Sequence, residues 1–325
     1  MTAPTALVMH PDCALHDTGW GHPEHQGRLP AVVKALYRDT PALLERVLQR
    51  EAVPAGIEDL RRVHTAGHIE RVRRAVEEAA ARGEQVFLDA DTPVSAASWD
   101  AALAAAGCAV TGTALVLDGA AATAFAAARP PGHHATAEEP MGFCLFNNVA
   151  VAARWAQAER GIERVLIVDW DVHHGNGTQD IFYEDPSVYY LSLHLAPHYP
   201  GTGSAAERGA GPGEGTTRNV PLPAGTTGAA YRRAFDAALD ATLDEFAPEL
   251  VLVSAGFDCL AGDPLGGLAL EPATLHGLTL ELLDRTRATA EGRLVAVLEG
   301  GYVPQRLGDG VLDVVRALAG LPSED

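Results

Sequence analysis

The chain has 325 residues, is 47% hydrophobic and carries a formal net charge of −19. A chain of this length can bury a sizeable core, and its length favours one or two domains. The strongly acidic balance argues against nucleic acid as the main partner, because phosphate groups repel negative charge. It is compatible with cationic ligands such as lysine-rich tails or polyamines, and also with a surface that only keeps the protein in solution.

Cysteine usage and the amino-terminal sequence indicate the compartment. Cys13, Cys108, Cys144 and Cys259 are widely spaced and form no CxxC pair, which fits a reducing cytosol. The first residues lack a basic region followed by a long apolar stretch, and no apolar run reaches about 18 residues without a charge. We therefore expect a cytoplasmic protein with no membrane partner.

Short apolar runs rich in β-branched residues alternate with longer stretches of 3.6-residue periodicity, which predicts strands alternating with helices. In chain order, the predicted elements are the strand Ala6–Met9, the helices Leu29–Tyr37, Ile69–Ala81 and Trp99–Leu117, the strand Ala122–Ala128, the helix Asn148–Glu159, the strands Val165–Val168 and Val188–Leu193, the helix Ala229–Phe246, the strand Leu250–Ser254, the helix Ala273–Ala290 and the strand Leu294–Leu298. This alternation predicts a parallel sheet covered by helices on both faces.

No internal repeat, linker or charge run marks a domain boundary, so we expect one domain over residues 1–325. The segment Ala205–Thr217 is rich in Gly, Ala and Glu and is expected to form a long surface loop. In the helix Ala229–Phe246, apolar residues recur at spacings of four, four and three, which predicts one apolar stripe against the sheet.

Ionisable residues follow four of the predicted strands. Arg129, Asp169 and Glu299 directly follow their strands. Asp258 comes four residues after Ser254, the end of its strand. In an open parallel sheet the ligand site lies beyond the carboxyl ends of the strands. The sequence therefore predicts that groups from four strands converge on one edge of the sheet.

The segment after Val165–Val168 has the composition of a cation site. If extended geometry continues, Asp169, Asp171 and His173 point to one side, since residues two apart share a face of a strand. Asp258 can add a ligand from another strand. Two carboxylates and one imidazole leave an open position on a zinc ion for water and substrate. The alternative without a metal is a strand end whose acids form salt bridges. No Lys or Arg lies between Val165 and Phe182 to neutralise these acids.

Two further groups add acid–base chemistry to this edge. Gly132 and the rigid prolines before it set His133 and His134 in a turn, and a histidine near neutral pKa is the usual general acid or base. Tyr302 follows Gly300-Gly301, where a phenol can point into a cleft and donate to an oxyanion. Taken alone, the histidine pair and the tyrosine are also compatible with ordinary loop and interface residues.

Together these segments resemble the zinc-dependent histone deacetylase superfamily, most closely its class II branch with the bacterial histone deacetylase-like amidohydrolases and acetylpolyamine amidohydrolases. The resemblance covers nearly the whole chain, with the motifs in order. The matching stretches are Arg129–Ala135 (RPPGHHA), Gly142–Cys144 with Asn147, Val168–Gln179 (VDWDVHHGNGTQ), Ser192–His194, Pro200–Gly203, Ser254–Asp258 (SAGFD), Ala261–Gly266 (AGDPLG), Glu299–Tyr302 (EGGY) and an early His22–Glu24 with Arg28.

The resemblance implies the three-layer arginase–deacetylase fold, with an eight-stranded parallel sheet between helices, and an enzyme that hydrolyses an acyl amide. It implies zinc ligands and catalytic groups, a channel for a linear side chain, and structural potassium beneath the zinc. The implied zinc ligands are Asp171, His173 and Asp258; the implied catalytic residues are His134 paired to Asn176, His133 paired to Asp169, and Tyr302; the implied channel residues are Gly142, Phe143, Tyr199, Leu265 and Gly300; and the implied potassium residues are Asp169, Asp171, His173, Ser192 and Leu193, with Phe182 and Val188 for a second ion.

Two positions bear on the type of enzyme within this superfamily. Asn176 stands where class I members have Asp, which fits class II. Tyr302 stands where some class II members carry His and are weak on acetyl-lysine, so tyrosine here implies a competent enzyme.

The acyl-amine substrate is either an acetylated lysine side chain or an acetylated polyamine or other small amine. Leu265 in the Gly-Asp-Pro-X-Gly turn favours acyl-lysine, because some polyamine-selective relatives have an acidic residue there. Asp91 and Glu24 keep the polyamine alternative open if either lies near the channel rim. A metal-binding scaffold without turnover is the alternative from another functional class. The motifs say nothing about oligomeric state.

Overall fold

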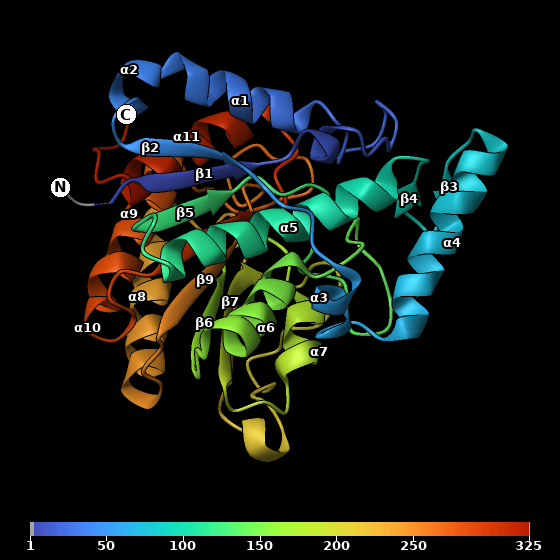
Figure 1. The fold of residues 1–325 in the computed structure, drawn as a ribbon. Coiled ribbons are helices and arrows are strands. Elements are labelled where there is room, and N and C mark those ends of the chain that lie inside the picture. The colour runs from blue at the N-terminus through green and yellow to red at the C-terminus, as the bar shows by residue number, and fades with distance from the viewer. Residues whose placement is uncertain (1–2, 325) are drawn as a thin grey trace.

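The main structural feature is one eight-stranded sheet in which every neighbouring pair of strands is parallel (Figure 1). The computed structural model describes residues 3–324. In order across the sheet, the strands are β2 (Val47–Glu51), β1 (Thr5–Met9), β5 (Thr123–Ala126), β10 (Leu294–Leu298), β9 (Leu250–Ala255), β6 (Val165–Asp169), β7 (Val188–Leu195) and β8 (Thr217–Leu222). The predicted α/β class and parallel sheet are therefore confirmed.

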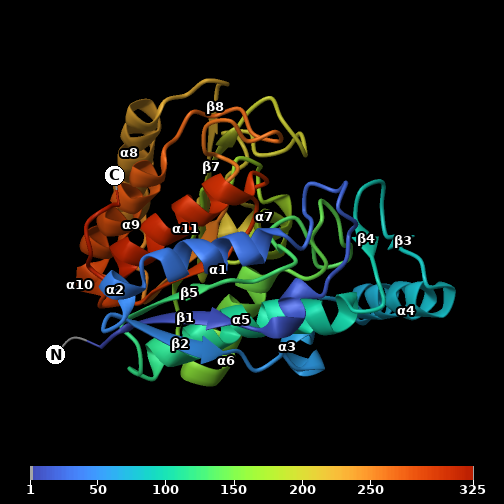
Figure 2. The same cartoon turned by 90° about the horizontal axis from the view of Figure 1, so that it is seen from above.

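Helices cover both faces of the sheet, which makes three layers (Figures 1 and 2). One face is covered by α5 (Ser98–Leu117) and α6 (Asn148–Arg160). The other face is covered by α8 (Gly228–Glu245), α9 (Pro272–Arg285) and α11 (Pro304–Leu318), with α1 (Arg28–Arg38) packed on α11. Of the stripe predicted on the fifth helix, Phe235 and Leu239 are 0% exposed and Phe246 is 8% exposed, whereas Leu243 is half-buried.

The remaining elements lie around these layers. The helix α4 (Ala66–Arg82) and the two-stranded ribbon of β3 (Val86–Phe87) and β4 (Pro93–Val94) extend to one side in both views (Figures 1 and 2). The other short elements are α2 (Thr40–Leu43), α3 (Ile57–Arg61), α7 (Asn176–Phe182), α10 (Arg287–Ala290) and the 3-10 turns Pro11–Ala14 and Gly211–Gly213. The prediction of one domain over residues 1–325 stays a prediction.

Among the described residues, one helix is long and apolar enough to cross a membrane by length and composition. It is α5, and 61% of its most apolar window is buried inside the fold. It packs on β5, β1 and β10 and on α6, so core packing accounts for its apolar character. All four cysteines are buried and free.

Several element predictions need correction. The predicted helix Ala273–Ala290 is interrupted: α9 ends at Arg285 and α10 resumes at Arg287. Between them the Thr286 hydroxyl donates to the Leu282 carbonyl at 2.6 Å, so the side chain takes part in the turn. The strand β8 begins at Thr217, inside the predicted loop Ala205–Thr217.

The helix α11 was not predicted. Gly308 and Gly310 lower its helix propensity. A Cβ atom on Gly308 would lie 2.8 Å from the Ala31 carbonyl oxygen of α1, so this glycine permits close packing of the two helices. Tertiary packing here outweighs local preference.

Candidate active site

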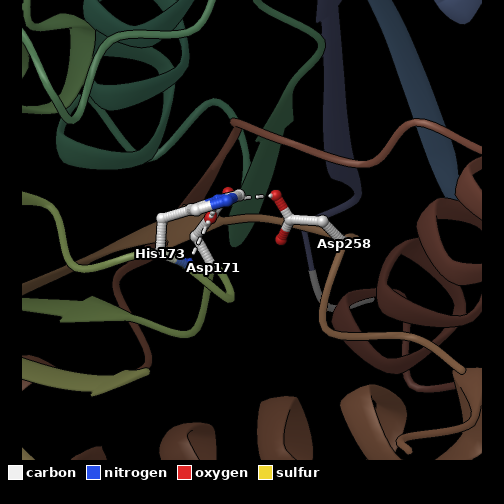
Figure 3. A group of neighbouring side chains, drawn as sticks. All are labelled: Asp171, His173 and Asp258. Atoms are coloured by element: carbon white, nitrogen blue, oxygen red, sulfur yellow. Dashed lines mark hydrogen bonds and ion pairs between the residues drawn. The ribbon is translucent and has the colours of Figure 1, made fainter. Parts of the chain in front are cut away.

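The polar residues that follow the strands meet at the carboxyl edge of the sheet, as the sequence predicts. Asp171 and His173 follow β6, and Asp258 follows the adjacent strand β9 (Figure 3). One ligand atom from each of these three side chains lies within 4.8 Å of the others, and all three are buried. They are the three residues that the sequence predicts as metal ligands.

The chemistry of this group fits a divalent cation. His173 Nδ1 lies 3.0 Å from Asp171 Oδ1 and 3.3 Å from Asp258 Oδ2. Asp258 Oδ2 is buried and makes no hydrogen bond. Within residues 3–324, the only ion-pair partners of the two carboxylates are His133 and His173. A buried carboxylate pair is costly unless a cation compensates it.

The pKa values of the three side chains reflect this crowding. Burial raises the pKa of Asp258 to about 7, and the charge of Asp171 adds to the effect. Burial favours a lower pKa for His173, but its hydrogen bond to Asp171 and its ion pair with Asp258 outweigh burial and raise the pKa to about 10. The raised pKa of His173 and the raised pKa of Asp258 both reflect negative charge that is confined in a buried group.

Backbone groups hold the two carboxylates. Asp171 Oδ2 accepts from Gly300 N at 2.9 Å, and Asp258 Oδ1 accepts from Val172 N at 2.9 Å. A Cβ atom on Gly300 would lie 2.0 Å from Asp258 Oδ2. Gly300, predicted for the channel, thus lies directly against Asp171 and Asp258, where a side chain does not fit. The three residues Asp171, His173 and Asp258 are called the metal group below.

His133 and Asp169 form the first predicted pair. His133 Nδ1 lies 3.0 Å from Asp169 Oδ2, and both side chains are buried. Burial favours a lower pKa for His133, but Asp169 and then Asp171 outweigh it and raise the pKa to about 10. His133 is therefore cationic beside the metal group. Asp169 ends β6 and lies outside the three-residue group, although the sequence places it on the same side.

His134 and Asn176 form the second predicted pair. His134 Nδ1 lies 2.8 Å from Asn176 Oδ1, so Nδ1 carries the hydrogen and Nε2 keeps a free lone pair. Burial, and then the charge of His133, lowers the pKa of His134 well below its usual value. Its ring centroid lies 4.1 Å from that of His133. Of the two adjacent histidines, His134 is thus neutral and His133 is charged.

Two predicted channel residues, Gly142 and Tyr199, lie against His134, and a third, Phe143, lies against Tyr302. A Cβ atom on Gly142 would lie 2.6 Å from His134 Cδ2 and 3.0 Å from the Tyr199 hydroxyl. The Tyr199 ring meets His134 edge-on at a centroid distance of 5.1 Å. Phe143 has a left-handed backbone, with φ 69°, and its ring meets Tyr302 edge-on at 5.9 Å. One aromatic ring therefore lies against the general acid–base candidate His134 and another lies against Tyr302.

Tyr302 is half-buried at the end of the turn after β10. Burial and the nearby Asp258 raise the pKa of its phenol well above the usual value, so the hydroxyl keeps its proton. The Arg28 guanidinium lies over its ring, 5.2 Å from the centroid. Gly301 before it has φ +119°, a conformation that favours glycine.

Leu265 and Asp91 are less buried than the predicted metal ligands, Leu265 being half-buried and Asp91 exposed. The Leu265 carbonyl accepts a hydrogen bond from His198 Nε2 at 2.8 Å, and the His198 ring stacks on His173. Asp91 is exposed, and its charge contributes to raising the pKa of Tyr199. Asp91 is therefore accessible from solvent and close enough to Tyr199 to affect its pKa.

Glu24 does not lie at the rim, which was one of the two possibilities that the sequence left open. It is fully buried, and its Oε1 accepts from Arg28 at 2.8 Å and from Arg129 at 2.8 Å. Arg28 in turn donates to the carbonyls of Gly301 and Glu299. Glu24 thus neutralises two arginines beneath the site and is not available to a substrate amine.

Three of the potassium candidates, Val188, Ser192 and Leu193, belong to β7, and Phe182 lies at the end of α7. Ser192 stands opposite Asp169 in the register of β6 and β7, and the Leu193 carbonyl accepts from Tyr231 at 3.1 Å. Phe182 ends α7, and Val188 begins β7. The potassium sites stay predictions.

Sequence reasoning missed two residues that support His133. Glu299 Oε2 accepts from Gly132 N at 2.6 Å and from His133 N at 3.2 Å. Tyr190 donates its hydroxyl hydrogen to Asp169 Oδ2 at 3.0 Å. Glu299 lies in the predicted EGGY stretch and was therefore visible in the sequence, whereas Tyr190 stands in a buried apolar strand with no signal of its role.

Comparison with known proteins identifies the family. Residues 22–318 match the family model described as the histone deacetylase domain. The chain belongs to the histone deacetylase family. The predicted resemblance is confirmed, and this histone deacetylase family member is a hydrolase that acts on amide bonds.

Relatives from plants, archaea and bacteria share this domain. The chain is 41% identical over 317 residues to histone deacetylase 10, chloroplastic, of Oryza sativa subsp. japonica, covering 93% of this chain and 70% of that protein. It is 40% identical to a probable deacetylase of Archaeoglobus fulgidus, covering 97% of this chain and 86% of the relative. It is 39% identical to the histone deacetylase-like amidohydrolase of Pseudomonas aeruginosa, covering 93% and 77%.

A solved structure confirms the fold. The crystal structure of the HDA15 HD domain superposes with a TM-score of 0.90 at 36% identity, covering 99% of this chain and 90% of that chain. The eight-stranded parallel sheet flanked by helices is therefore the predicted arginase–deacetylase fold.

Proposed function

We propose that this histone deacetylase family hydrolase is a zinc-dependent enzyme that removes the acetyl group from an acetylated lysine side chain or a related acylated amine, releasing acetate. The proposal rests on one juxtaposition: the buried group of Asp171, His173 and Asp258 lies next to a neutral His134 and a protonated Tyr302. A metal group, a base and an oxyanion donor are what amide hydrolysis at a metal site requires.

Asp171, His173 and Asp258 would hold the zinc ion. These two carboxylates and one imidazole would supply three protein ligands, a number that leaves room for water and substrate on the ion. When bound, zinc lowers the pKa of water and polarises a carbonyl group. Val172 N and Gly300 N keep the two carboxylates oriented through their hydrogen bonds.

His134 acts as the general base and then as the general acid. Its Nδ1–H is held by Asn176, so Nε2 is the nitrogen that accepts a proton from the attacking water. The same Nε2–H then delivers the proton to the leaving amine nitrogen. The cationic His133, paired to Asp169, stabilises negative charge that develops beside it.

Tyr302 donates its hydroxyl hydrogen to the oxygen of the tetrahedral oxyanion. Its phenol remains protonated at neutral pH, which a donor requires. Gly142, Phe143 and Tyr199 confine the acylated side chain, since Gly142 and Tyr199 lie against His134 and Phe143 lies against Tyr302. Potassium near Ser192 and Leu193 and near Phe182 and Val188, and a cytoplasmic location, belong to the same proposal.

The Tyr302→Phe variant tests the role of the hydroxyl. Removing one oxyanion donor costs about 10²–10³ in turnover, so we expect a loss of that size in kcat with zinc content unchanged. Both are measured on purified protein with a fluorogenic acetyl-lysine substrate and a chromophoric chelator. Full activity in this variant contradicts the role of Tyr302.

A side-by-side assay distinguishes the substrate classes. The Leu265 side chain offers no charge to a distal ammonium, and Glu24 is buried against two arginines, so acyl-lysine is favoured over acetylpolyamine. The kcat/KM values on an acetyl-lysine peptide and on N-acetylputrescine are compared. A higher value on N-acetylputrescine supports the acetylpolyamine alternative, with Asp91 as the residue to vary. Turnover of neither substrate supports a scaffold without catalysis.

A further inference from the structure

Several backbone groups of the turn that carries Tyr302 are each held by a different partner. Gly300 N donates to Asp171 Oδ2 at 2.9 Å, and the Gly300 carbonyl accepts from Phe257 N at 3.0 Å. The Gly301 carbonyl accepts from Arg28 Nε at 2.7 Å. These bonds fix the glycines of the turn. They leave the amide of Tyr302 itself to be held from elsewhere.

That amide is held by Asp263. Tyr302 N donates to Asp263 Oδ2 at 2.7 Å, which is shorter than most neutral amide hydrogen bonds and fits a charged acceptor. Asp263 lies in the loop after β9, 39 residues away in sequence. The second oxygen, Oδ1, accepts from Leu265 N at 3.0 Å. One half-buried carboxylate therefore joins the Leu265 turn to the backbone of Tyr302.

The Leu265 turn is also tied to the metal group. The Leu265 carbonyl accepts from His198, and the His198 ring stacks on His173 at a centroid distance of 4.9 Å. The Asp263 carbonyl accepts from Gly266 N at 3.2 Å and closes the turn. The turn thus has a fixed position relative to a predicted metal ligand, and Asp263 transmits that position to Tyr302.

We propose that Asp263 is a positioning residue for the reaction, which sets the Tyr302 hydroxyl relative to the metal group through the hydrogen bond to the Tyr302 amide. The inference rests on the proposed role of Tyr302 as oxyanion donor. Asp263 holds the backbone amide of Tyr302, and the phenol hydroxyl lies at the far end of the same residue. A rotation of this peptide group therefore moves the hydroxyl by more than it moves the amide. Small displacements of a catalytic group have large effects on rate.

The Asp263→Asn variant tests the proposal. An asparagine of the same shape can accept only one of the two amide hydrogens, because its NH₂ group is a donor. We expect kcat on an acetyl-lysine substrate to fall about tenfold or more with little change in KM, as for a group that acts only in the transition state. Hydrogen–deuterium exchange of the peptide covering residues 299–303 is expected to be faster than in the wild type.

Asp313→Asn is the matched control. The buried Asp313 also divides its two oxygens between a backbone amide and a second donor, Glu324 N at 2.9 Å and Ser323 Oγ at 2.9 Å, but lies on α11 outside the site. We expect it to lower the melting temperature at most, with kcat and the exchange of residues 299–303 unchanged.

A double-mutant cycle separates positioning from general stability. If Asp263 acts through the Tyr302 hydroxyl, adding Asp263→Asn to Tyr302→Phe changes kcat by less than about twofold, because the group that it positions is already absent. An equal loss of kcat in both backgrounds, or no loss in either, overturns the proposal. Full activity of Tyr302→Phe alone instead contradicts the proposed role of the tyrosine, so the two failures are distinguishable.

Asp263→Ser serves as a second variant in case Asp263→Asn does not fold. Serine keeps one acceptor oxygen on a shorter side chain, so the same kcat loss and the same exchange pattern are expected. Failure of both variants to fold assigns Asp263 a purely structural role and overturns the proposal.

Discussion

At the scale of single residues, the site depends on backbone that comes very close to carboxylates. A Cβ atom on Gly256 would lie 2.1 Å from Asp171 Oδ2, and one on Gly300 would lie 2.0 Å from Asp258 Oδ2. Both distances are well inside van der Waals contact, so only glycine fits at these positions. Asp171, His173 and Asp258 were predictable from sequence because each follows a recognisable buried strand. The structural roles of Glu24 and Asp263 were not predictable, since nothing in the sequence indicates their partners. Glu24 pairs with Arg129, 105 residues away.

The Gly300→Ala variant tests this packing. The added methyl group displaces Asp258 Oδ2 or Asp171 Oδ2, so we expect zinc affinity to fall about 10–100-fold, as for other changes behind metal ligands. Gly67→Ala is the control, because the nearest atom to its Cβ is Thr65 Oγ1 at 3.8 Å. Zinc affinity is measured by competition with a chromophoric chelator. Unchanged affinity in Gly300→Ala argues against these carboxylates as ligands.

At the scale of elements, burial decided what could be predicted. The central strands β6, β9 and β10 are buried along their whole length, so their runs are continuously apolar and were recognised. The edge strands were missed: β2 is exposed over Gln49–Glu51, and β8 contains Arg218, Asn219 and Pro221. Such residues are typical of strand edges and do not differ from those of loops.

The channel segment between residues 136 and 147 is held at both ends by one buried histidine. His64 Nδ1 donates to the Thr136 carbonyl at 2.9 Å, and His64 Nε2 accepts from Asn147 N at 2.9 Å. Gly142 and Phe143 lie between these two anchors. Burial lowers the pKa of His64 to about 3, so the ring stays neutral in the folded protein.

This histidine predicts a pH dependence of stability. The unfolded chain binds the His64 proton with the ordinary pKa of 6.5 and the folded chain only at about 3. The unfolded state therefore binds more protons between these values, and the free energy of unfolding falls as pH falls from 6.5 toward 3. His64→Gln keeps a donor and an acceptor and removes this titration.

We expect thermal unfolding of His64→Gln, followed by circular dichroism, to show a smaller decrease of melting temperature over this pH range than the wild type. Other buried histidines keep part of the slope in both proteins. A decrease as steep as in the wild type contradicts the assignment of the proton to His64.

At the scale of the whole molecule, the metal group joins segments that follow two neighbouring central strands. Asp171 and His173 come from the end of β6 and Asp258 from the end of β9, and the Tyr302 turn follows β10 beside them. A ligand that binds only the folded state stabilises it by about 2.7 kcal/mol at 100 times its Kd. Zinc is therefore expected to raise the melting temperature and a chelator to lower it.

The most direct measurement is acetate release from an acetyl-lysine peptide by three preparations: the wild type stripped with a chelator, the stripped wild type supplied with zinc, and Asp258→Asn supplied with zinc. The account predicts no turnover in the first, full turnover in the second and a loss to near background in the third. Undiminished turnover by the stripped enzyme, or by Asp258→Asn, would contradict a zinc-dependent deacetylase built on Asp171, His173 and Asp258.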